Sequence, residues 1–289
     1  MFARRSFLIG AALAPLASAP AHAQASSTQV WPARPVMLII PFPAGGAMDL
    51  LGRGVAQELA DKLGQQFVVD NRAGAAGNIG AMAAAKASPD GYTILMAGAA
   101  SLALNKFMFS NMPYDPETEL TPIVILSRLP HIFVVNAKVE AKTLKELVDY
   151  AKTNPGKLSA GVPGVGTTAH ITLEAFMAET GAKMTVVPYR AEPQMLTDLV
   201  GGQLDFACTL TTSPGPHIQA GRLRALAVTS ATRTQQLPDV PTVEQAGFPA
   251  SKPPPGLRWP HPPGRRRTLL RRSIPPRTPS FAVRRARRN

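Results

Sequence analysis

A repeated unit of strand, glycine-rich turn and helix constrains the fold of this chain more than any other feature. In the first copy, the continuous apolar run Val36–Ile40 precedes the turn Pro41–Gly46, and apolar residues then recur at positions 48, 51, 55, 59 and 63 with a helical spacing. A strand without polar alternation is typical of a parallel sheet that is covered on both faces. Strands that alternate with helices therefore predict an open parallel α/β sheet.

The same pattern continues along most of the chain. We expect further strands at 66–70, 92–97, 123–126, 132–135, 158–162, 184–187, 204–209 and 223–230, and helices at 79–87, 143–153, 167–179 and 193–200. Thr143 and Glu146 predict a capping box at one helix start. Crossovers near 120–130 and 225–235 predict two α/β lobes, the first formed by residues 24–125 with 230–250 and the second by residues 126–229.

The formal net charge of +13 comes from the two ends of the chain. Residues 24–250 hold 17 Lys and Arg against 18 Asp and Glu, whereas residues 251–289 hold 11 Arg, nine Pro and no acid. Such a segment cannot bury enough apolar surface to fold, so we expect disorder there. It is read either as a basic arm for nucleic acid or anionic lipid, or as the product of a shifted reading frame. For the nearly neutral body we expect no nucleic-acid partner.

The N-terminal residues 1–23 are typical of an export signal. Arg4 and Arg5 precede the short apolar run Phe7–Leu16, and Ala21–Ala23 form a small-x-small cleavage site. The arginine pair leaves both an ordinary and a twin-arginine signal open. We therefore expect a periplasmic protein that begins near Gln24. A single Cys excludes a disulfide framework and a Cys-based zinc site.

Two corresponding turns are candidates for anion binding. Ala44–Gly46 and Gly164–Thr168 each lead from a strand into a helix. A helix N-terminus carries unpaired N–H groups and a partial positive charge, so two such ends across a cleft would hold a small carboxylate. The alternative is that the glycines only make tight turns and that Thr167 caps its helix.

The patterns for catalysis are weaker. The chain has neither a P-loop nor a G-x-G-x-x-G fingerprint, and its five His residues form no H-E-x-x-H zinc motif. Asp70 ends a strand where a ribose-binding acid would sit, which keeps a secreted nucleotide-dependent oxidoreductase as the alternative function. Cys208 is interpreted as a buried core thiol, His170 as either a packing residue or a cleft contact, and Asp49 as an acceptor for backbone N–H groups. We expect no cofactor, no metal and no enzymatic activity.

A series of motifs resembles the Bug family, the periplasmic solute-binding receptors of tripartite tricarboxylate transporters. The motifs occur in the same order as in that family: Trp31–Pro35, Pro41–Gly46 with Asp49, Asn71–Gly80, Pro89–Tyr92, Pro113–Asp115, Gly164–His170, Val187–Tyr189, Asp198–Asp205, Leu226–Thr229 and Leu237–Thr242. The chain departs from the family after Gly247–Pro249, where the family continues and returns to the first lobe. That departure predicts that the chain as given folds poorly.

The resemblance implies a periplasmic-binding-protein-like fold, in which two α/β lobes close on a small organic carboxylate like a Venus flytrap and present it to a membrane permease. Carried over by position, it implies these ligand-binding residues: Phe42, Pro43, Ala44, Gly45, Gly46, Asp49, Val165, Gly166, Thr167, Thr168, His170 and Asp205.

Overall fold

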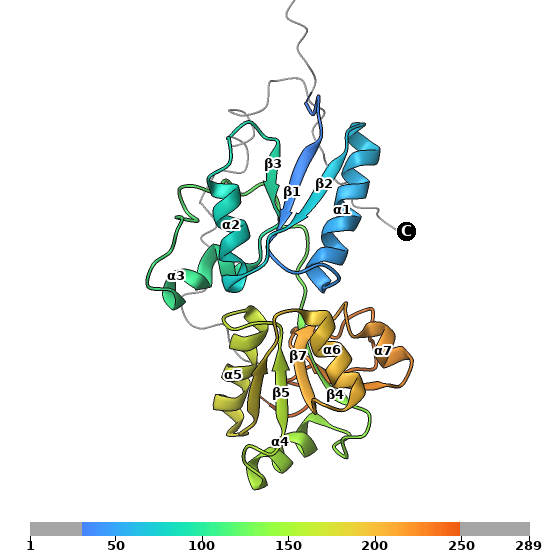
Figure 1. Cartoon of the computed structure of the whole chain (residues 1–289). Coiled ribbons are helices and arrows are strands. Elements are labelled where there is room, and N and C mark those ends of the chain that lie inside the picture. Colours follow the sequence, from blue (N-terminus) through green and yellow to red (C-terminus); the bar gives the residue numbers. More distant parts are fainter. Residues whose placement is uncertain (1–30, 249–289) are drawn as a thin grey trace, which may run out of the picture.

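The computed structural model describes residues 31–248, which form two α/β lobes stacked end to end (Figure 1). The first lobe contains a three-stranded parallel sheet in the order β2-β1-β3, built from β1 (Val36–Ile40), β2 (Phe67–Asn71) and β3 (Thr93–Leu95). All three strands fall where the apolar runs predict them. The predicted export signal and the Arg/Pro-rich segment 251–289 lie outside the described residues.

The helices of the first lobe flank this small sheet. They are α1 (Ala47–Leu63), α2 (Asn78–Ala85), the short η1 (Ala75–Gly77) and η2 (Ala100–Leu104), and α3 (Asn105–Met108). The apolar stripe of α1 packs on the sheet with Val36, Leu38 and Ile40 at the centre of the core. Gly64 ends α1 in the left-handed conformation, and its N–H donates to the carbonyl of Ala60.

The second lobe contains a five-stranded sheet in the order β6-β5-β7-β4-β8. Its strands are β4 (His131–Asn136), β5 (Ser159–Val162), β6 (Thr185–Pro188), β7 (Phe206–Leu210) and β8 (Leu223–Val228). β5 runs parallel to β6 and β7, whereas β4 runs antiparallel to both β7 and β8. The expectation of a wholly parallel sheet is therefore wrong for this lobe, because the chain enters it through a strand that runs against its neighbours.

Helices α4 (Leu144–Thr153), α5 (Thr168–Thr180), α6 (Glu192–Gly201) and α7 (Gly215–Gln219) accompany this sheet. Phe133, Phe176 and Phe206 meet in its core, with ring centroids 4.7 and 5.5 Å from that of Phe133. At the start of α4 the hydroxyl of Thr143 accepts from the N–H of Glu146, as predicted, but the Glu146 carboxylate accepts from Lys142 rather than from the capping residue itself.

Two segments differ from the sequence prediction. Residues 123–126 form no strand, and their side chains are 49–70% exposed, because the described residues supply no neighbouring strand for their backbone groups. The sequence predicts that residues 230–250 belong to the first lobe, but the described part of this segment packs on the two core clusters of the second lobe, through Leu237, Val240, Val243 and Phe248. This apolar packing places the segment with the second lobe.

Within residues 31–248 no helix has the length and apolar character needed to cross a membrane. The same residues contain no group of three or more His, Cys, Asp or Glu that could hold a metal ion.

Candidate functional site

The two predicted turns both lie at the junction of the lobes, at the carboxyl ends of parallel strands. β1 leads into residues 41–46 and the start of α1, and β5 leads into residues 163–167 and the start of α5. In Figure 1 the N-terminal end of α1 lies directly above the N-terminal end of α6. Ligands of open α/β sheets bind beyond the carboxyl ends of the strands, so this junction is the candidate site.

Asp49 organises the first turn, as the sequence predicted. The residue is 2% exposed, and its carboxylate accepts hydrogen bonds from the N–H of Gly45, Nε of Arg53 and Nδ2 of Asn71, each at 2.9 Å. Burial works to raise the pKa of Asp49, but the hydrogen bonds from Arg53, Gly45 and Asn71 outweigh it and lower this pKa below its ordinary value. The carboxylate is therefore committed to holding the turn.

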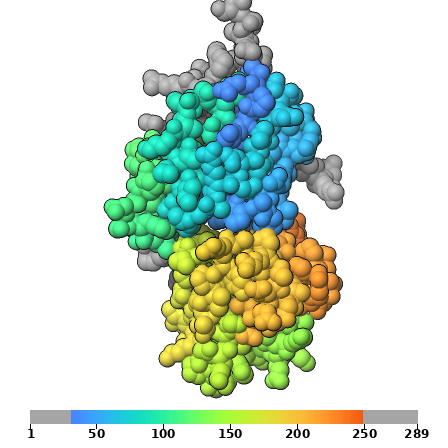
Figure 2. Space-filling model, viewed as in Figure 1, coloured from blue at the N-terminus to red at the C-terminus, as the bar shows by residue number. Residues whose placement is uncertain are grey.

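The first turn contacts the second lobe through Glu192, the first residue of α6. The N–H of Ala47 at the start of α1 donates to Oε2 of Glu192 at 2.8 Å, and the side chain of Pro193 lies against Gly45. In Figure 2 the blue atoms of the first lobe rest directly on the yellow atoms of the second. Sequence reasoning missed Glu192, for which the only signal was an acid at the start of a predicted helix.

Local contacts tie together the second turn and α5. Thr167 caps α5, because its hydroxyl accepts from the N–H of His170 at 3.3 Å and donates to the carbonyl of Gly164 at 2.9 Å. The N–H of Gly166 donates to Nδ1 of His170 at 3.2 Å. The structural reading of Thr167 as a helix cap is thus confirmed, and His170 supports the backbone of the turn.

The two turns do not form the directly facing pair that the sequence suggested. Gly46 faces Glu192, whereas Gly166 faces Ala76 and Met108 of the first lobe, whose atoms would lie 3.4 and 3.1 Å from a Cβ added at Gly166. Each turn therefore approaches a different segment of the opposite lobe. Ala44, Gly45 and Val165 are exposed, Phe42, Pro43 and Thr168 are half-buried, and Gly46, Gly166 and Thr167 are buried.

The half-buried His131 contacts the start of α5 beside the second turn. Its Nε2 lies 3.1 Å from the hydroxyl of Thr168, and its Nδ1 lies 3.4 Å from the hydroxyl of Thr172. Burial lowers the pKa of His131 to about 4, so the ring is neutral near pH 7. No sequence motif links His131 to this turn, so sequence reasoning missed the residue.

The expected placement of Asp205 at the cleft is wrong. Asp205 immediately precedes β7, and its carboxylate accepts from the N–H and hydroxyl of Ser159 at 2.8 and 2.7 Å. Ser159 begins β5, whose other end carries the Gly164–Thr168 turn. Asp205 therefore links the amino ends of two parallel strands, on the edge of the sheet opposite the junction.

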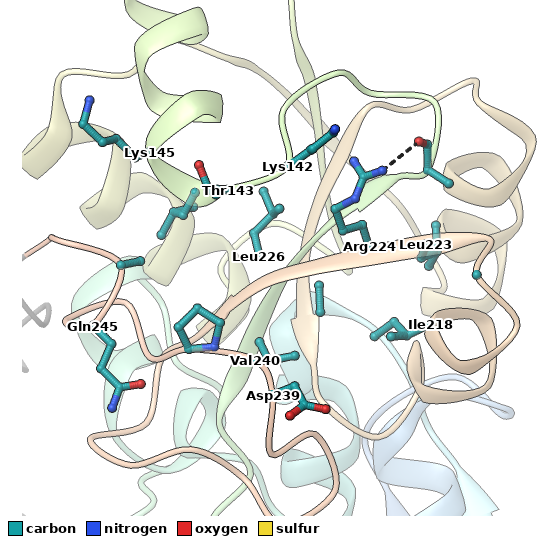
Figure 3. Close-up of a pocket in the computed structure, with 16 residues that line it drawn as sticks. Lys142, Thr143, Lys145, Ile218, Leu223, Arg224, Leu226, Asp239, Val240 and Gln245 are labelled. Atoms are coloured by element: carbon teal, nitrogen blue, oxygen red, sulfur yellow. Dashed lines mark hydrogen bonds between the residues drawn. The ribbon is translucent and has the colours of Figure 1, made fainter.

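A separate cavity of about 770 Å³ lies on the second lobe, away from both turns (Figure 3). Residues of α4 and β8 and the segment 239–246 line it, with Lys142, Lys145 and Arg224 as its cations. The Arg224 guanidinium donates to the carbonyls of Ala137, Val139 and Ala141, so its hydrogen bonds are already made to the backbone. None of the residues predicted to bind a ligand lines this cavity.

Solved structures of similar proteins share this two-lobed fold. A structure described as R. palustris Rpa4515 with adipate is 38% identical, with a TM-score of 0.73 over 76% of this chain and 73% of that chain. The structure of the periplasmic binding protein BugD is 33% identical, with a TM-score of 0.73 over 77% and 74% of the two chains. MatC from Rhodopseudomonas palustris with bound malate is 27% identical, with a TM-score of 0.71 over 77% and 76%.

Proteins with similar sequences belong to the same group as these solved structures. A UPF0065 protein of Pseudomonas sp. strain P51, from the tcbD-tcbE intergenic region, is 39% identical over 85% of this chain and 72% of its own length. Protein BugT of Bordetella pertussis is 38% identical over 77% and 69%. Residues 51–271 match the profile of the tripartite tricarboxylate transporter family receptor, TctC. The chain therefore belongs to the TctC family of tripartite tricarboxylate transporter receptors, which includes the Bug proteins.

Proposed function

We propose that this receptor captures a small dicarboxylate at the lobe junction in the periplasm and delivers it to the permease of a tripartite transporter. The observation that carries the proposal is the bond from the N–H of Ala47 to the Glu192 carboxylate, because it shows a carboxylate seated at the start of α1 between the lobes. Helix N-termini favour such anions through their free N–H groups and partial positive charge. The adipate and malate in the relatives' structures support the same class of ligand.

The chemistry at the junction is recognition without catalysis. Asp49, Thr167 and His170 are hydrogen-bonded to the backbone of the turns, so they shape the turns and supply no free nucleophile or base. The side chain of Glu192 lies against Gly46 and occupies the N–H of Ala47, so a ligand would reach this N–H only when the lobes separate. Rigid-body closure of the lobes would then follow binding. The alternative oxidoreductase has no support from the fold or from the relatives.

A thermal-shift screen tests the proposal. The chain would be melted alone and with adipate, malate or citrate, and with adipamide as the uncharged control for adipate. A ligand at 100 times its Kd adds about 2.7 kcal/mol, which raises Tm by about 5–10 °C for a chain of this size. A shift with an acid but not with adipamide is expected. Carboxylate capture would be contradicted if none of the three acids, at millimolar concentration, raised Tm above that of the chain alone. An equal shift with adipamide and adipate would also contradict it.

A further inference from the structure

Glu192 places a protein carboxylate between the two lobes. The residue begins α6 in the second lobe and is 9% exposed. Its Oε2 accepts from the N–H of Ala47 in the first lobe at 2.8 Å, and its other oxygen is hydrogen-bonded to the hydroxyl of Thr209 at the end of β7. Each carboxylate oxygen therefore has a hydrogen-bond partner, one in the first lobe and one in the second.

The N-terminal ends of two helices meet at the Glu192 carboxylate. Glu192 lies in the first turn of its own helix α6 and contacts the first N–H of α1, so the positive ends of two helices stabilise one anion. Hydrogen bonds to an ionised group are about twice as strong as neutral ones. A carboxylate that bridges two helix ends in this way is the arrangement expected of a bound acid ligand.

The backbone of the first turn makes room for this contact. A Cβ added at Gly46 would lie 3.0 Å from Oε2 of Glu192, closer than side chains normally pack. Glycine at position 46 thus permits the carboxylate to reach the N–H of Ala47. Beside it, the ring of Pro193 would lie 3.4 Å from a Cβ at Gly45, so the contact extends from Gly45 to Ala47 in the first lobe and over two residues of the second.

We propose that Glu192 is a latch that holds the lobes together without a ligand, by occupying the anion position at the start of α1 with the protein's own carboxylate. One consequence rests on the proposed function: an acid ligand that uses the N–H of Ala47 must first displace Glu192. The latch itself does not depend on the ligand, because both of its partners belong to the chain.

Distances between spin labels in the ligand-free full chain test the latch. Gly54→Cys in α1 and Gly201→Cys in α6 place one label on each lobe, and an added Cβ at either position meets no atom within 4 Å. Native Cys208 is buried, and burial raises the pKa of its thiol far above the ordinary value, so it resists labelling. Pulsed electron-spin measurements then report the populations of closed and open molecules.

Three variants are compared in this labelled background. Glu192→Ala removes the carboxylate, Glu192→Asp keeps an acid at the start of α6 but shortens its reach, and Glu179→Ala removes an exposed acid of α5 as the control. For both Glu192 variants the ratio of closed to open molecules is expected to fall about tenfold or more, the contribution of one hydrogen bond to a charged group. The control and the parent chain should give the same closed distance.

Two results would overturn the latch. One is a parent chain that is already open without ligand, and the other is an unchanged distance distribution in both Glu192 variants. Circular dichroism spectra of each variant show that the lobes remain folded, and Glu192→Asp serves where Glu192→Ala unfolds. Because no ligand is added, failure of the latch leaves the thermal-shift result standing. If no acid binds, the distances measured without ligand still test the latch.

Discussion

Two glycines of α1, two residues apart, offer a direct test of how the first lobe is packed behind the site. Gly52 is buried, and a Cβ added there would lie 2.3 Å from Cδ1 of Ile40 and 3.0 Å from Sδ of Met96. Gly54 is exposed, and a Cβ there meets no atom within 4 Å. Gly52→Ala and Gly54→Ala therefore make the same chemical change in the same helix with opposite surroundings.

The expected free energies of unfolding follow from two effects. Alanine in a helix interior is about 1 kcal/mol more favourable than glycine, so Gly54→Ala is expected to stabilise the chain by about 0.5–1 kcal/mol. The same gain at Gly52 is opposed by overpacking against Ile40, which costs about 1–3 kcal/mol. Because the helix propensity cancels between the two variants, their difference of about 1–3 kcal/mol isolates the packing cost.

Urea unfolding followed by far-UV circular dichroism measures this difference. Ile40 is the last residue of β1 before the first turn, so the strain at Gly52 should also displace the start of α1 and weaken binding of an acid ligand. Equal stability of the two variants would refute the packing described here, because it would mean that α1 does not lie against Ile40.

Three further outcomes are expected. Asp49→Ala should lower the free energy of unfolding by about 2–4 kcal/mol, because Gly45 and Asn71 lose their acceptor, and Asp49→Asn should recover part of this loss in the same urea assay. The folded-state pKa of His131 lies below its unfolded value, so stability should be full above pH 6.5 and fall by about 2 kcal/mol by pH 5. A pH series on His131→Gln should lack this component, and an unchanged slope would refute the assignment. Ile123→Thr should reduce the binding of a hydrophobic dye and leave Tm within about 2 °C, since the Ile123 side chain is 68% exposed.

Local sequence patterns predicted most elements because each pattern reflects one buried face. The continuous run Val36–Ile40 and the helical spacing that follows it require a two-faced sheet and an amphipathic helix, and β1 and α1 appear within a residue of the expected bounds. The run at 123–126 carries the same apolar signal but forms no strand. An apolar run indicates that a segment can form a strand. The strand forms only where a neighbouring strand offers free backbone N–H and C=O groups to pair with.

The direction and lobe of a segment depended on contacts between residues far apart in the chain. β4 runs antiparallel to β7 and β8, which its apolar sequence cannot reveal. Residues 230–248 pack on the second lobe through Val243 and Phe248, positions that were not distinguishable from first-lobe core by composition. Both errors concern where an element lies and not whether its residues are buried.

In the candidate site, too, local features could be predicted from the sequence, whereas contacts between distant residues could not. The turn chemistry of Gly45 and Asp49 is local, so the sequence predicts it, and the helix cap at Thr167 is one of the two interpretations that the sequence leaves open. Glu192 is 145 residues from Ala47, and only the stacking of the lobes brings the two together. For Asp205 the sequence did contain the missing signal, because a residue that precedes β7 lies at the strand's amino end, away from the turns.

A crystal structure of the chain with the acid that gives the largest thermal shift tests the central claim most directly. The structure described here predicts the ligand carboxylate at the lobe junction, within hydrogen-bond distance of backbone N–H groups in residues 45–48 or 165–168. Density for the acid beside Lys142 and Arg224, in the cavity of the second lobe, would contradict capture between the lobes.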